Sequence, residues 1–371
     1  MKVSTFSGFT QEKIEFILNG FEFSEKGAEL AKIFDLLPLW KYVPRSALTG
    51  RPPIPRLNIL KLFILKAVLN ISQNKQLRDF VKGSEELWRL CGWVGSNDIP
   101  SEPTLSRVFK DFANMGVPEM IHTDLIKNIF KGKIIGHISR DATAVLAREK
   151  PVKKVKVKKV PGKRGRPKKG TPPQPKTPTR IERQVSQELD EMVSELPVAC
   201  DTGYKINSQG NPSYWRGYKL HADWSDEGIP VSYLVTSASM HDSQASIPLT
   251  IMSSKRTQYL YELMDAGYDV VQIQTMSERH NHAPIIKPNN RRSKVKRVLE
   301  SYRARRYRIR SVAERGFGAL KDDFRIEGSR FRGDAKVKAH IGFAMVVLTM
   351  RKIFQYENKF SNILENLKKT S

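Results

Sequence analysis

The apolar positions of the chain recur with two different periods, and the change between them divides the sequence into regions. From residue 57 to about residue 115 they follow the spacing of helices, and the run at 58–70 is apolar enough to be buried. Strand-like alternation follows at 133–145, 213–225 and 229–239. Because a turn sequence, Asp-Glu-Gly, separates the last two segments, we predict that they form an antiparallel hairpin.

The second half of the chain mixes strands and helices. A helix is expected within 241–254, capped by Asp242 or Ser243, and a strand at 259–264 runs into a turn at Asp265. A short strand follows within 282–290, and helical character extends from about residue 294 through 321. The largely apolar segment 335–357 is predicted to be a long helix that packs on the sheet.

These elements predict an α/β protein with a small all-helical domain before its mixed sheet. The helices of 56–130 resemble a helix-turn-helix arrangement, although a bundle that only packs or dimerises fits the pattern equally well. The chain is expected to begin with an N-terminal segment (1–55) and a helical, DNA-binding domain (56–130). A catalytic domain in two pieces follows (131–147 and 187–355), and a basic disordered insert (148–186) separates the pieces. The chain ends in a C-terminal tail (356–371).

The net charge of +26 indicates a polyanionic partner, and nucleic acid is the usual one. A ribosomal or merely basic surface protein is the alternative on charge alone. Cys91 and Cys200 are the two cysteines of the sequence, which argues against a disulfide framework or a zinc site and fits a reducing, cytoplasmic location. We expect no signal peptide and no membrane span, because the apolar runs are absent or too short.

Much of the charge lies in a low-complexity segment. Residues 148–169 contain twelve Lys or Arg and one acid, Glu149, so this segment is expected to stay disordered until it binds a partner. Within it, residues 163–169 resemble an AT-hook, a motif whose arginines enter the narrow minor groove of A/T-rich DNA. The residues that carry this resemblance are Arg164, Gly165, Arg166, Pro167 and Lys168. A solvated, flexible tether is the alternative.

Three acids occupy positions that suit a shared site. Asp141 is predicted to end the first strand and Asp265 a later one, and Glu314 lies on a helix that follows. On that helix the spacing places Tyr307, Arg310, Glu314 and Lys321 on one face. Carboxylate oxygens suit Mg²⁺ or Mn²⁺, and two such ions are expected for phosphodiester chemistry. Alternatively, Arg310 and Glu314 form only an i, i+4 surface salt bridge.

The order of elements is that of a ribonuclease H-like fold, and the motifs resemble the DDE transposases of bacterial insertion sequences. The resemblance rests on Ser-Arg-Asp-Ala-Thr at 139–143, Asp-Ala-Gly-Tyr-Asp at 265–269 and the Tyr-(2)-Arg-(3)-Glu-(6)-Lys spacing at 307–321. It implies that Asp141, Asp265 and Glu314 hold the metals, and that Tyr307, Arg310 and Lys321 contact DNA phosphates.

The resemblance also implies an activity. It is cleavage at transposon ends followed by strand transfer into target DNA, by a homodimer or larger assembly on double-stranded DNA. A nuclease without strand transfer, or an inactive DNA-binding relative, remains the alternative. One departure concerns the interval between Asp265 and Glu314, which is too short for the large β insertion of some relatives. The hairpin intermediate that this insertion supports is therefore in doubt.

Overall fold

The structure is a computed structural model that describes residues 23–44, 54–152, 177–206, 209–291, 295–328 and 330–356. The AT-hook-like residues 163–169 lie outside the described residues, and so does the predicted C-terminal tail from residue 357 onward. At the ends of the predicted insert, 148–152 and 177–186 are described, and the second piece contains the short helix α8 (Arg180–Gln184).

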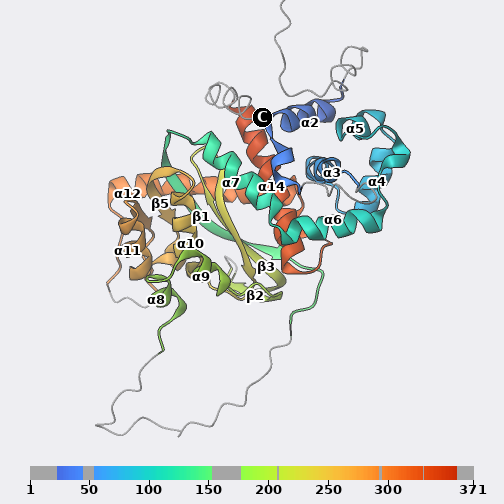
Figure 1. Cartoon of the computed structure of the whole chain (residues 1–371). Helices are drawn as coiled ribbons and strands as arrows, with labels where there is room; N and C mark the ends of the chain where they lie inside the picture. Colours follow the sequence, from blue (N-terminus) through green and yellow to red (C-terminus); the bar gives the residue numbers. More distant parts are fainter. Residues whose placement is uncertain are drawn as a thin grey trace, which may run out of the picture.

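Within the described residues, six strands form one mixed sheet with helices on both faces (Figure 1). They are β1 (Ile134–Leu146), β2 (Asp201–Ile206), β3 (Pro212–Trp224), β4 (Pro230–Ser237), β5 (Gln258–Met264) and β6 (Ala283–Ile286). β3 pairs antiparallel with β1, β2 and β4, whereas β1 with β5 and β5 with β6 are parallel. The predicted hairpin is β3–β4, and the arrangement as a whole confirms the expected ribonuclease H-like α/β class.

β1 is longer than predicted. We expected this strand to end at Asp141, but it continues to Leu146. Residues 142–146 stay in the sheet because β3 offers an antiparallel partner along their whole length, from Ala142 opposite His221 to Leu146 opposite Gly217. Asp141 instead marks the place where the parallel neighbour β5 has ended, since β5 stops at Met264.

Alternate residues of β1 point to opposite faces of the sheet. One face, here called the Asp141 face, is covered by α12 (Ser301–Tyr307), the 3₁₀ turn η5 (Arg308–Arg310) and α13 (Ser311–Asp322). The other, the Arg140 face, carries α10 (Ser246–Ser254) and α11 (Val271–Arg279), with α9 (Leu189–Ser194) beside α10.

Three further 3₁₀ turns are η3 (Asp242–Ala245), η4 (Ala266–Tyr268) and η6 (Ile326–Gly328). The cap before α10 differs from the prediction. His241 precedes η3, and its ring nitrogen accepts from the backbone N–H of Ser243, so neither Asp242 nor Ser243 is the cap.

The N-terminal part of the chain is helical, and several of its helices pack against the long C-terminal helix. They are α2 (Glu25–Leu36), η1 (Leu39–Tyr42), α3 (Arg56–Val68), α4 (Asn74–Lys82), α5 (Glu85–Leu90), η2 (Ser96–Asp98), α6 (Glu102–Asn114) and α7 (Val117–Ile129). The long helix α14 (Asp334–Gln355) touches β4, but it lies chiefly against α3, α6 and α7 (Figure 1). We expected α14 to pack on the sheet, but the sheet supplies only the smaller part of its contacts. A helix that is apolar on nearly all sides needs partners on all of them, and the N-terminal helices supply most of these.

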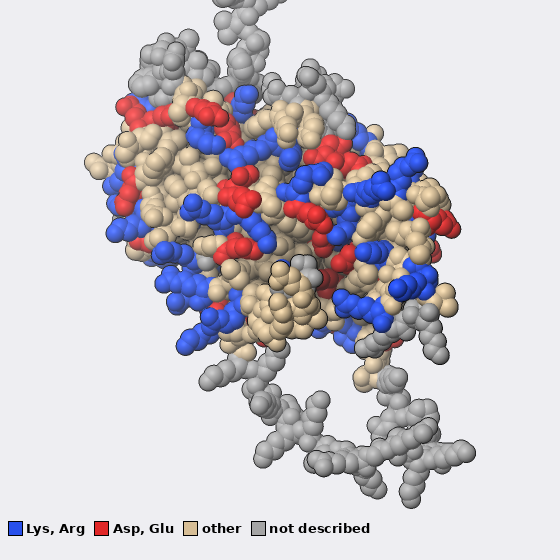
Figure 2. All heavy atoms as spheres, turned by 180° about the vertical axis from the view of Figure 1, so that it is seen from behind, with Lys and Arg blue, Asp and Glu red and all other residues tan. Residues whose placement is uncertain are grey.

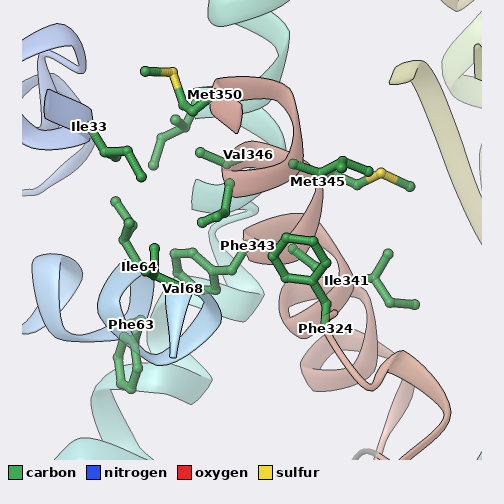
Figure 3. Packing of buried hydrophobic residues seen from close by; sticks show 14 of the residues in the cluster. Ile33, Phe63, Ile64, Val68, Phe324, Ile341, Phe343, Met345, Val346 and Met350 are labelled. Carbon is green, nitrogen blue, oxygen red and sulfur yellow. The ribbon is translucent and has the colours of Figure 1, made fainter. Parts of the chain in front are cut away.

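One hydrophobic core joins the first described helices to the last one. Figure 3 shows Ile33, Phe63 and Ile64 of the N-terminal helices packed towards Phe343 and Val346 of α14. The approach of α14 is close, since a Cβ at Gly342 would lie 2.7 Å from Pro118 Cβ and 2.8 Å from the Tyr233 hydroxyl. The domain boundaries remain a prediction, but the helical region and the sheet share this core. No helix in the described part of the chain has both the length and the apolar character of a membrane span.

Candidate active site

Parallel pairing of β1 and β5 brings two aspartates to neighbouring positions. Ser139 is paired with Leu263, and the same register continued by two residues sets Asp141 opposite Asp265. Asp265 follows β5 directly and accepts a hydrogen bond from Gly267 N (2.8 Å), while Asp141 accepts one from Ala142 N (2.9 Å). Burial raises the pKa of Asp141 above its ordinary value, and the charge of Asp265 raises it further, although Arg310 opposes the shift.

Arg310 links the first of these aspartates to the glutamate. Its Nη1 donates to Asp141 Oδ2 at 2.7 Å, and its Nη2 lies 3.4 Å from Glu314 Oε1. The i, i+4 pair of Arg310 and Glu314, the alternative interpretation of their spacing, is therefore present. It does not stand alone, because the same guanidinium also reaches across to the sheet. Asp141 is largely enclosed, with 22 % of its side chain exposed, whereas Glu314 is 66 % exposed.

The helix of the Tyr-Arg-Glu-Lys motif is interrupted. We expected one helical face for all four residues, but α12 ends at Tyr307, and a 3₁₀ turn precedes α13. Tyr307 remains close to Arg310, whose guanidinium carbon lies 5.8 Å from the ring centroid. Lys321 follows Glu314 by two turns, about 10 Å along the axis, and its ammonium pairs with Glu327 at 2.7 Å. The contacts thus join Asp141, Arg310 and Glu314, with Asp265 and Tyr307 beside them, and leave Lys321 apart.

The donor chemistry of the site suits a hard divalent cation, since Asp141, Asp265 and Glu314 all offer carboxylate oxygens. In the arrangement described here, no three Asp, Glu, His or Cys side chains among the described residues are close enough to hold a metal ion. The cation between Asp141 and Glu314 is the guanidinium of Arg310.

A glycine seats the helix that carries Glu314. A Cβ built on Gly316 would lie 2.4 Å from Trp224 Cζ3, far inside normal contact, so α13 rests directly on the indole ring. Trp224 is the last residue of β3 and is fully buried, and Phe317 meets it edge-on at 5.3 Å. This role of Gly316 was not predicted, although a glycine inside a predicted helix is a signal of close packing.

A buried ionic network lies behind the aspartates, on the Arg140 face. The Arg140 guanidinium binds both carboxylate oxygens of Asp223 (2.7 and 2.8 Å) and Glu262 Oε1 at 3.1 Å. It also donates to Ser246 and Thr250 of α10 at 2.8 and 2.9 Å. The three ionic side chains are fully buried. Because they belong to β1, β3 and β5, the network fixes the strands that present Asp141 and Asp265.

A second cluster holds α12 on the Asp141 face. Asp226 accepts from His137 Nδ1 at 2.9 Å, and Arg306 donates to His137 Nε2 at 3.1 Å. This pattern assigns a neutral His137 with its proton on Nδ1. The Arg306 guanidinium also lies 4.2 Å from the centre of the Tyr261 ring. None of these residues was predicted from sequence, because their pairing depends on the sheet register.

Comparison with known proteins gives two matches. Residues 176–350 are similar to a family model described as a transposase DDE domain, and residues 19–111 to one described as a transposase domain. The first match includes Asp265, Tyr307, Arg310, Glu314 and Lys321, whereas Asp141 lies between the two. No curated protein matches the chain.

Proposed function

Since the chain belongs to the DDE transposases of insertion sequences, we propose that it cuts DNA at the ends of a mobile element and joins those ends to target DNA. The observation that carries this proposal is the placement of Asp141 beside Asp265, with Arg310 linking Asp141 to Glu314. Asp141 and Asp265 lie at neighbouring positions of the sheet, and Glu314 of α13 shares Arg310 with Asp141. Together they offer the carboxylate oxygens that metal-dependent phosphodiester chemistry uses.

DDE transposases generally use divalent metal ions, and in this chain Asp141, Asp265 and Glu314 would hold Mg²⁺ or Mn²⁺, with two ions proposed. Such ions supply an activated water and stabilise the leaving oxygen. To take up this role, Asp141 and Glu314 exchange their contact with Arg310, which frees its guanidinium for a phosphate group. Tyr307 and Lys321 are proposed as further phosphate contacts, and Lys321 then gives up Glu327.

Double-stranded DNA is the proposed partner, as transposon end and as target. Lys and Arg side chains are spread over much of the surface seen from behind, with smaller groups of acids between them (Figure 2). A surface rich in Lys and Arg attracts a polyanion such as DNA. Because two ends must be held together, we propose that the protein acts as a dimer or a larger assembly on DNA.

The test uses a duplex that carries the sequence flanking the coding region, incubated with the protein and Mn²⁺ or Mg²⁺. The wild-type protein should cut the duplex at the element's end and produce joined products with a supercoiled target. The variants Asp141→Asn, Asp265→Asn and Glu314→Gln should lose cleavage by at least about 10³-fold, because each removes a charge on which the metal site depends. Each should keep its affinity for the duplex.

Asp322→Asn is the matched control, because it removes an exposed acid from the same helix as Glu314. This control should cut like the wild type. If Glu314→Gln cut as well as Asp322→Asn, the assignment of Glu314 would be wrong. Cleavage without any joined product would favour a nuclease over a transposase.

A further inference from the structure

The chain that approaches Arg310 is unusually basic. Between residues 295 and 310 the sequence contains seven Lys or Arg and a single acid, Glu300. In the structure this segment forms α12, which lies against β5 and β6, and then η5, which lies against β1 and β5 on the Asp141 face. It therefore ends at the candidate active site, where Arg310 binds Asp141.

Three of these cations have partners within the protein. Arg297 pairs with Asp269, Arg306 is held by His137 and Tyr261, and Arg310 is held by Asp141. The remaining four have no hydrogen bond or ion pair to any described residue, and we name them the basic strip: Lys296, Arg303, Arg305 and Arg308. The strip is firmly seated, because the paired Arg306 and Arg310 fix the helix and the turn that carry most of it.

Electrostatic repulsion among the four cations of the basic strip destabilises the protein when nothing is bound to them. Cations on neighbouring positions of one short helix and turn repel one another, and no carboxylate of the described residues forms an ion pair with any of the four. Lys296, Arg305 and Arg308 are exposed, and Arg303 is partly exposed. A surface of this kind is complementary to a line of phosphate groups.

We propose that the basic strip binds the phosphate backbone of duplex DNA next to the cleavage position. This inference rests on the proposed function and adds the path of the DNA: along α12, over the Asp141 face, towards Asp141 and Asp265. α12 has seven residues and is about 10 Å long. That length spans about three phosphates of one strand at 3.4 Å along the DNA axis.

The experiment measures binding of the full-length protein to a fluorescent 30-base-pair duplex of arbitrary sequence, at several KCl concentrations and without divalent metal. The variant Arg305→Ala/Arg308→Ala removes two exposed cations of the strip. Its control, Lys127→Ala/Lys255→Ala, also removes two exposed cations without partners among the described residues. Both lysines line a groove between α7, α9 and α10. They suit the control because α10 lies on the Arg140 face, whereas the basic strip lies on the Asp141 face.

The strip variant should bind about tenfold more weakly at moderate salt. Its slope of log K against log [KCl] should be less steep by about 2, since each phosphate contact contributes about 0.9. The control should keep the wild-type slope, and thermal unfolding should show that both variants fold. Equal slopes in the strip variant and the control would overturn the proposal. Cleavage is measured separately. If the strip variant had a less steep salt dependence of binding but the wild-type protein cut no DNA, the proposed function would be wrong and the proposed role of the basic strip in DNA binding would still hold.

Discussion

The close contact between Gly316 of α13 and the Trp224 ring can be tested by substitution, because this contact positions the helix that carries Glu314. In Gly316→Ala, the added Cβ would lie 2.4 Å from Trp224 Cζ3, whereas carbon atoms pack best at about 3.5–4.0 Å. The helix or the ring must therefore move by about 1.1–1.6 Å. Trp224 is fully buried, so the side chains packed around it oppose any displacement of the ring. Overpacking of this kind costs about 1–3 kcal/mol, and alanine recovers up to about 1 kcal/mol in helix propensity.

The expected result is a net loss of about 1–2 kcal/mol and a melting temperature a few degrees lower. Gly318→Ala on the same helix is the matched control. Its Cβ would meet nothing within 4 Å, so this variant should gain up to about 1 kcal/mol. Because Glu314 lies two residues before Gly316, a shift of about 1 Å should also slow cleavage by up to about 10²-fold.

Differential scanning fluorimetry of the two variants at one pH, with cleavage assays beside it, checks the reasoning. The difference in melting temperature between Gly316→Ala and Gly318→Ala carries the test, because both variants make the same change to backbone entropy. If Gly316→Ala melted at or above the temperature of Gly318→Ala, α13 would not rest on the indole as described.

Two further substitutions probe buried charges, each measured by urea unfolding. Arg140→Met should cost about 3–5 kcal/mol, because Asp223 and Glu262 keep their buried charges but lose the cation that they share, and only hydroxyl groups still donate to them; a loss under about 1 kcal/mol would contradict the network. Lys66 is buried beside Asn74 and the Phe331 ring, and burial lowers its pKa to about 7. The unfolded chain keeps this proton up to the ordinary pKa of 10.5, so wild-type stability should rise from pH 7 towards 10, by up to about 1.4 kcal/mol per unit. Lys66→Met should therefore gain most at pH 6 and progressively less above pH 7, and a gain independent of pH would refute the assignment.

The sequence predicted local features well where one pattern decides the structure. Alternation and the Asp-Glu-Gly turn identify β3 and β4, and the end of β5 just before Asp265 follows from the break in its apolar run. The expected end of a strand at Asp141 was wrong because an acid in a strand looks like a boundary. The partner that extends β1 lies more than seventy residues later, in β3.

Contacts between residues far apart in the sequence could not be predicted from its local pattern. The spacing of Arg310 and Glu314 predicts their mutual contact, but not that Arg310 also binds Asp141 across the sheet. Arg140 beside Asp141 gives no sign that it is fully buried, since its acidic partners come from two other strands. The roles of the three carboxylates in metal binding, and of Tyr307, Arg310 and Lys321 in phosphate binding, stay predictions.

The core that joins α14 to the first helices has a consequence for synthesis on the ribosome. The helices up to α7 end at Ile129, but the helix that completes their core begins at Asp334, about 200 residues later. At about 5–20 residues per second, that interval lasts roughly 10–40 s. During this time the apolar surfaces of α3 and α6 lack their final partner. A nascent chain interrupted before α14 therefore leaves the N-terminal helices without a closed core, and we expect such a fragment to be a target for chaperones and proteases.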